Sequence, residues 1–241
     1  MAEKKSLKDQ NAWLIRAAMI AHIVAFAAVS MRPLQLLGTD TRGLMVKLQA
    51  AALPGSASLG LIVIASLILL GLVPSALRDK LVHLRWSDPL PGCRAFTEVG
   101  PSASHVNMSA IENKHGPLPT APSEQNQLFY RIYRDYRDDV GVLDAHRRYL
   151  AARDIGTITA MLVIPLPLLS WAITRDGTRS VSYCAALLVI YLLCALAAKN
   201  YSRRMVEHVL ALASSRRKKA PSPSEGRGPI HLKSAGAALR E

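Results

Sequence analysis

The sequence predicts an all-α, polytopic membrane protein with four transmembrane helices in two hairpins and a small cytoplasmic helical layer. Two observations carry this prediction. Half of the 241 residues are apolar although 30 are Lys or Arg, which gives a net charge of +13. The apolar residues are also gathered into four runs that are separated by the basic residues. A helix needs about 20 apolar residues to cross a bilayer, and each run has about that length.

The four predicted spans differ in charge. In the first, Arg16 lies close enough to the start for its side chain to reach the lipid headgroups. The other three contain no charged residue, which is unusual for helices buried in a soluble core. The spans are Ala12–Met31, Leu59–Leu77, Ile155–Ile173 and Val181–Ala198.

The beginning of the chain has a second interpretation. Lys4, Lys5 and Lys8 precede an apolar stretch, as in a signal peptide. However, the apolar stretch is long for a signal peptide, and no convincing A-x-A cleavage site follows it. We therefore expect the first run to be a transmembrane helix.

The spans predict four segments. Residues 1–77 form the first hairpin, 78–154 the cytoplasmic helical segment, and 155–198 the second hairpin. Residues 199–241 form an amphipathic juxtamembrane helix and a basic disordered tail. In the cytoplasmic segment, Ser123 is expected to cap a helix, and residues 142–154 to run directly into the third span.

Basic residues near the spans predict the orientation, because Lys and Arg are retained in the cytoplasm. They are concentrated at the N-terminus, at both ends of residues 78–154, and after the fourth span. With an even number of spans, all these positions fall on one side. We expect an inner-membrane protein with both termini cytoplasmic, and no nucleic-acid binding, since no such motif accompanies the charge.

Three pieces of the cytoplasmic segment occur as a set: DPLPGCRAF (88–96), EQNQLFYRIYR (124–134) and HRRYLAARD (146–154). With the flanking spans they resemble a group of uncharacterised bacterial four-span membrane proteins with a central cytoplasmic segment. The resemblance covers about the middle half of the chain and implies no activity. The layout is also similar to that of small membrane effectors in bacterial anti-phage systems, which is an analogy of architecture alone.

The stretch LPGCRAF (90–96) is the first candidate for chemistry. Cys93 could be a nucleophile if Arg94 and a histidine lowered its pKa. The alternative is a structural elbow in which the prolines stiffen the turn and Cys93 packs. We favour the elbow, because nothing marks a base or an oxyanion hole. The sequence also predicts no metal site and no cofactor.

His22 is the second candidate, because it lies near the middle of the first span. Polar groups at such depth usually face the interior of the bundle. Ser66 and Tyr191 lie at a similar depth and are its expected hydrogen-bond partners. In the third span, Pro165 and Pro167 predict a kink, since each removes a helical hydrogen bond. A kinked span can belong to a transport path or merely bend around its neighbours.

The basic residues after the fourth span are expected to contact anionic lipid headgroups. They are Arg203, Arg204, Arg216, Arg217, Lys218 and Lys219. The leading functional prediction is a non-enzymatic oligomeric scaffold, effector or pore-forming component. It would act through a homo-oligomer or a partner protein bound at residues 78–154. A membrane enzyme that uses Cys93 with a histidine, and a small transporter or channel, are the alternatives.

Overall fold

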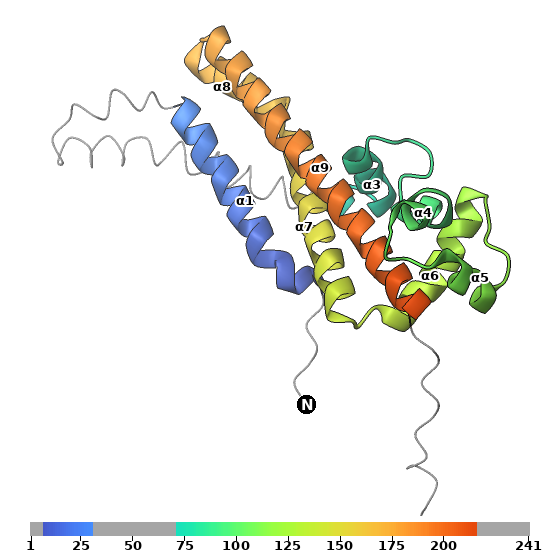
Figure 1. The fold of residues 1–241 in the computed structure, drawn as a ribbon. Helices are drawn as coiled ribbons and strands as arrows, with labels where there is room; N and C mark the ends of the chain where they lie inside the picture. The colour runs from blue at the N-terminus through green and yellow to red at the C-terminus, as the bar shows by residue number, and fades with distance from the viewer. Residues whose placement is uncertain (1–6, 31–70, 216–241) are drawn as a thin grey trace, which may run out of the picture.

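The computed structural model describes residues 7–30 and 71–215, and every element in these two ranges is helical (Figure 1). The predicted second span, Leu59–Leu77, lies mostly outside them. The same holds for Ser66 and for the basic residues Arg216, Arg217, Lys218 and Lys219.

Three long helices form the main body: α1 (Leu7–Ser30), α7 (Val140–Leu162) and α9 (Gly177–Ser215). α7 packs along α9 and also contacts α1 (Figure 1). Among the described helices, α1 and α9 are each long and apolar enough to cross a membrane. α7 with α8 (Pro165–Thr174) forms a third candidate, a pair bent by 41°. The described chain is thus all-α with two or three candidate membrane-spanning helices.

The bend between α7 and α8 falls where the prolines predict it. Pro165 is the first residue of α8, and Pro167, two residues later, is buried. Because Pro167 has no N–H, the carbonyl of Val163 loses its usual helical partner. The thiol of Cys184 donates to that carbonyl at 3.5 Å. The kink is therefore held by a contact from α9.

A group of short helices packs against one end of this body. They are η2 (Pro91–Arg94), the π-helix η3 (Ala95–Val99), α4 (Gly100–Ser102), α5 (Met108–His115) and α6 (Pro122–Tyr136). Together with the first turns of α7 and the last four turns of α9 they form what we call the helical layer. Its core includes Ile111, Ile132, Val142, Val206 and Leu210, each at most 1% exposed. The layer therefore has a dry core of its own.

One buried amide ties this layer together. The side chain of Gln125 in α6 accepts a hydrogen bond from the backbone N–H of Phe96 at 3.1 Å and donates one to the carbonyl of Thr120 at 2.8 Å. It also bonds the hydroxyl of Thr97. Gln125 is 1% exposed, and these bonds satisfy it. They fix α6 against η3.

The chain breaks at Pro74, and a separate helix, α3 (Ser75–His83), follows. α9 continues unbroken from the predicted fourth span through residue 198 into the layer. One local prediction needs correction: the cap of α6 is Ala121, with Pro122 as first helical residue, in place of Ser123.

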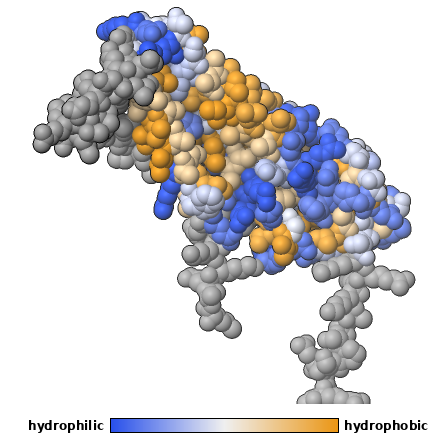
Figure 2. Space-filling model, turned by 60° about the vertical axis from the view of Figure 1, so that its left-hand side comes forward, coloured by the Kyte–Doolittle hydropathy of each residue, from blue (hydrophilic) through white to orange (hydrophobic). Residues whose placement is uncertain are grey.

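The surface separates into two parts. Large exposed apolar side chains lie on α1, α8 and the first half of α9, for example Trp13, Ile173 and Leu193. Figure 2 shows these hydrophobic residues as a band between hydrophilic ends, with the helical layer mostly hydrophilic. A water-soluble protein seldom exposes so large an apolar patch.

Candidate ligand pocket in the helical layer

A buried ionic cluster joins α3 to α7 where the helical layer meets the long helices. Asp79 accepts hydrogen bonds from the hydroxyl of Tyr149 at 2.7 Å and from the Arg153 guanidinium at 3.3 Å. Arg153 Nε also donates to Asp154 at 2.9 Å, and Arg78 reaches the same carboxylate at 3.3 Å. Two guanidinium groups thus face two carboxylates, with no net charge.

The cluster has structural consequences. Arg153 and Asp154 are 6% and 5% exposed, so each charge depends on its partners for the solvation that water would give. Removing one member of such a group leaves an uncompensated buried charge. The cluster therefore holds α3 in one place against α7.

A pocket of about 220 Å³ lies beside this cluster, between α3, α6 and α7. Its walls include the aromatic side chains of Phe129, Tyr130, Tyr133 and Tyr149. The hydroxyl of Tyr133 lies 2.8 Å from His146 Nδ1, which sets the orientation of both rings. Asp79, Arg153, His146 and the amide of Asn126 supply polar groups. Aromatic walls with a few placed polar groups are typical of small-molecule sites.

The segment LPGCRAF forms part of this pocket through Leu90, Pro91 and Gly92. A Cβ at Gly92 would lie 2.4 Å from Asn126 Oδ1 and 2.9 Å from Phe129 Cδ1. Real Cβ contacts are not so short, so only glycine lets the elbow approach α6 this closely. The LPGCRAF segment therefore forms one wall of the pocket.

Cys93 and Arg94 point to a structural role for the rest of the motif. Cys93 is 6% exposed and does not line the pocket. Burial, with a further contribution from Asp88, raises the pKa of its thiol, which is the opposite of what an activated nucleophile needs. Arg94 pairs with Glu98 at 3.7 Å. Among the described residues, no three His, Cys, Asp or Glu side chains form a metal-binding group.

His22 is buried in α1, 7% exposed, and faces α7. Its Nδ1 lies 2.7 Å from the carbonyl of Ala18 and its Nε2 lies 3.1 Å from Thr159 Oγ1. The Ala18 carbonyl accepts from Nδ1–H, and the Thr159 hydroxyl lies between His22 Nε2 and the carbonyl of Ile155, to which it donates at 2.9 Å. Thr159 is thus the observed interhelical partner of His22.

The two expected partners of His22 behave differently. Tyr191 does not bond His22; its hydroxyl donates to the carbonyl of Leu81 at 2.8 Å and thereby ties α9 to α3. That part of the prediction is wrong. Ser66 lies outside the described residues.

Two basic residues after the fourth predicted span have distinct contacts. Arg203 pairs with Glu207 at 2.9 Å and donates to Ser102 Oγ at 2.6 Å, so it binds the helical layer to α9. Arg204 is exposed and lines a separate polar cavity.

No protein-family model, no curated protein and no solved structure matches this chain.

The cluster and its pocket were not predicted from the sequence. There, Arg78 and Arg153 contribute only to the basic residues at the two ends of residues 78–154. A signal was present, since acidic and basic residues occur together at both of these span ends, and buried charges require partners. Their pairing across 70 or more residues depends on the fold and could not be read locally.

Proposed function

We propose that this chain is a non-enzymatic integral membrane protein of the scaffold or effector type. Its helical layer would bind a small ligand and pass the effect to the membrane-spanning helices. The observation that carries the proposal is the continuity of α9. Tyr183 and Leu187 pack in the core between the long helices, while Val206 and Leu210 of the same helix pack in the core of the layer. A shift of one end of such a helix moves the other.

A membrane protein with four spans is part of this proposal. α1 ends at the end of the body far from the helical layer, whereas α3 packs within reach of the layer (Figure 1). An odd number of crossings between these two points supports one further span in the intervening sequence. The apolar run Leu59–Leu77 suits that span.

The orientation in the membrane is part of the same proposal. The first residues of α1 and α7 and the last residues of α9 all lie at the layer end of the body (Figure 1). The basic residues that predict the cytoplasmic side belong to this end. We place the helical layer and both termini in the cytoplasm of a cell with an inner membrane.

The pocket suggests the chemistry of the ligand. Stacking surfaces from Tyr130, Tyr133 and Phe129 favour a planar group. The Asn126 amide has donors and an acceptor for such a group. A planar, polar small molecule fits these features best.

Of the two alternatives, the Cys93 enzyme has the weaker support, because the thiol is buried and its pKa is raised. The transporter or channel has the contact of His22 with Thr159 and the bent α7–α8 pair in its favour. A second copy or a partner protein at residues 78–154 is compatible with the exposed Trp86 and Tyr130, which are 75% and 58% exposed.

The test is recovery of the ligand with the protein. The full chain is purified from its native membranes under mild conditions, and small molecules released on denaturation are identified by mass spectrometry. We expect one planar polar compound in about equimolar amount. Asn126→Trp, which fills the pocket, should reduce it at least about tenfold. Gln127→Trp is the matched control, because Gln127 is the next residue in α6 and its side chain is exposed and lies outside the pocket.

Two further results decide between the hypotheses. Cys93→Ser should retain the compound and any cellular phenotype, because the elbow needs the size of the residue and not its thiolate. Equal recovery from both Trp variants, or no equimolar compound from the unmodified chain, would refute the pocket as the site of function. Loss of all activity in Cys93→Ser at normal expression would favour the enzyme.

A further inference from the structure

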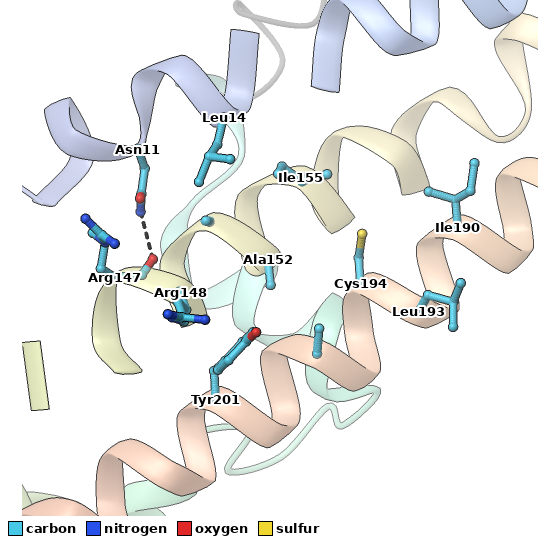
Figure 3. Close-up of a pocket in the computed structure, with 12 residues that line it drawn as sticks. Asn11, Leu14, Arg147, Arg148, Ala152, Ile155, Ile190, Leu193, Cys194 and Tyr201 are labelled. Atoms are coloured by element: carbon cyan, nitrogen blue, oxygen red, sulfur yellow. Dashed lines mark hydrogen bonds between the residues drawn. The ribbon is translucent and has the colours of Figure 1, made fainter. Parts of the chain in front are cut away.

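A second pocket, of about 500 Å³, lies between the long helices and away from the helical-layer pocket (Figure 3). α7 forms its floor through residues such as Ala152 and Ile155, while Leu14 of α1 and Leu193 of α9 belong to its walls. Most of its surface is apolar. We call it the lateral groove.

The two ends of the lateral groove differ in chemistry. Toward the α8–α9 turn its wall ends at Ile190, next to Leu193 and Cys194 (Figure 3). Toward the helical layer it ends at Arg147, Arg148 and Tyr201. Ile190 to Tyr201 spans about 16 Å of helix. The groove is thus amphipathic along the axis of the bundle.

A polar cavity of about 230 Å³ adjoins the basic end and shares Arg148 and Tyr201 with the lateral groove. Arg204 and His208 of α9 also line it. The only acidic side chain in its lining is that of Asp144, which pairs with Arg148 at 2.8 Å and with Arg147 at 3.4 Å. One carboxylate therefore faces three guanidinium groups, which leaves the site positively charged.

The basic end is held in shape by the protein. Asn11 is 2% exposed, and its amide donates to the carbonyl of Arg147 at 2.8 Å, which joins α1 to α7 (Figure 3). The guanidinium of Arg148 also lies over the ring of Tyr201, 5.9 Å from its centre. These contacts place the Arg148 charge between the polar cavity and the apolar groove.

The level of the site along the bundle matches a membrane surface. On α9 the exposed apolar side chains end at Leu196, and the first charged residue follows at Lys199. The lateral groove crosses this limit, with its apolar part on one side and its arginines on the other. A molecule that fits has an anionic head and a hydrocarbon tail.

We propose that the lateral groove and the adjoining polar cavity bind one anionic phospholipid. Its phosphate lies between Arg148 and Arg204, and one acyl chain runs along α7 past Ala197 toward Ile190. The proposal rests on the membrane location of the long helices but not on the ligand of the helical layer, so either can fail without the other.

Native mass spectrometry of the full chain in mild detergent tests this proposal. The probes are phosphatidylglycerol and phosphatidylcholine with the same acyl chains. We expect one phosphatidylglycerol to be retained at least about tenfold more strongly than phosphatidylcholine. Arg148→Gln with Arg204→Gln should weaken that retention at least about tenfold, given the usual gain from each basic residue at an anionic headgroup. Arg148→Lys with Arg204→Lys keeps the charge and should retain most of it.

Two controls separate this site from general attraction. Arg131→Gln with Arg137→Gln removes the same charge from exposed positions outside both cavities and should have no effect. Ala197→Trp, which fills the groove, should abolish retention, whereas Ala186→Trp on the exposed face of α9 should not. Equal binding of the two lipids would overturn the proposal, and so would a lack of effect of the Gln pair in folded protein. The proposal would also fail if the groove retains no lipid because another segment or a second copy covers it.

Discussion

The two halves of α9 expose opposite kinds of surface although they belong to one helix. In the half nearer the N-terminus, Leu188, Leu192 and Leu196 are between 45% and 55% exposed. In the half nearer the C-terminus, Val206, Val209 and Leu210 are 0% exposed, while Arg203 and Arg204 face outward. The second half buries its apolar residues and exposes its charged ones, as a helix in water does, whereas the first half exposes apolar residues. One helix is therefore built for an apolar environment in its first half and for water in its second, with the change near Lys199.

The most damaging substitution is expected at the join between these two regions. Asp79→Ala leaves two guanidinium groups facing the single carboxylate of Asp154 and leaves the buried Tyr149 hydroxyl without its acceptor, and it should lower the free energy of unfolding by about 3–5 kcal/mol. Thermal unfolding in detergent measures this loss. Asp144→Ala is the control: it removes a half-exposed carboxylate with two arginine partners and should cost at most about 1 kcal/mol. Equal losses would mean that the cluster does not join α3 to α7.

The next substitution compares the two halves of α9 directly. Leu210→Ala opens a cavity in the core of the helical layer and should cost about 2–5 kcal/mol. Leu192→Ala, on the exposed apolar face, should cost under about 1 kcal/mol in detergent, since its side chain contacts the surrounding apolar phase. Similar costs at both positions would contradict the assignment of two environments.

The third prediction concerns pH and the α3 end of the layer. Burial lowers the pKa of His83 to about 4, against the opposing effect of Asp79 and with help from Arg94 and Lys199. The unfolded chain takes up this proton near its ordinary pKa of 6.5, before the folded protein does. Stability is therefore complete above pH 6.5 and falls toward pH 4, by at most about 3 kcal/mol.

A matched variant isolates this histidine. His83→Gln should reduce the fall in stability between pH 6.5 and 4, with the remainder coming from His115 and His146, whose pKa values burial also lowers, while His105→Gln, in an exposed loop, should leave it unchanged. A wild-type stability that does not fall in that range would contradict the buried, neutral state of His83.

The smallest expected effect lies between the long helices. His22→Ala and Thr159→Val each remove one side of the same hydrogen bond and should each cost about 0.6–2 kcal/mol. In a double-mutant cycle the two losses should not add, because both report one contact. Full additivity would show that His22 and Thr159 do not interact. A loss of activity with unchanged stability would instead make His22 a functional residue.

How much of this could be predicted from the sequence depends on the range of the interactions. The uncharged apolar run predicted the helix at residues 155–162, and the prolines predicted the break at Pro165. The helical spacing of apolar residues predicted the amphipathic stripe from Met205 to Ala213. The partner of that stripe was not predicted, because it packs against Phe96, Ile111 and Leu128, about 100 residues away. Tyr191 was placed by depth alone, and depth does not say which way a side chain points.

The pocket beside the ionic cluster was harder to predict for the same reason. Its walls come from α3, the LPG elbow, α6 and α7, which meet only in the folded chain. Gly92 carried the one local signal, since a glycine between Pro91 and Cys93 suggests a close approach of backbone to another element. The sequence did not say that the element was α6.

The most direct test of the whole account is the side of the membrane from which three single cysteines react. They are placed at Gln127 in α6, Thr178 in the first turn of α9 and Leu192 further along α9, in a chain whose three natural cysteines are replaced. A membrane-impermeant maleimide should label Gln127→Cys only in inverted vesicles and Thr178→Cys only in intact spheroplasts. Leu192→Cys should react in neither until the membrane is dissolved. Labelling of positions 127 and 178 from the same side, or ready labelling of position 192 in intact membranes, would contradict the account.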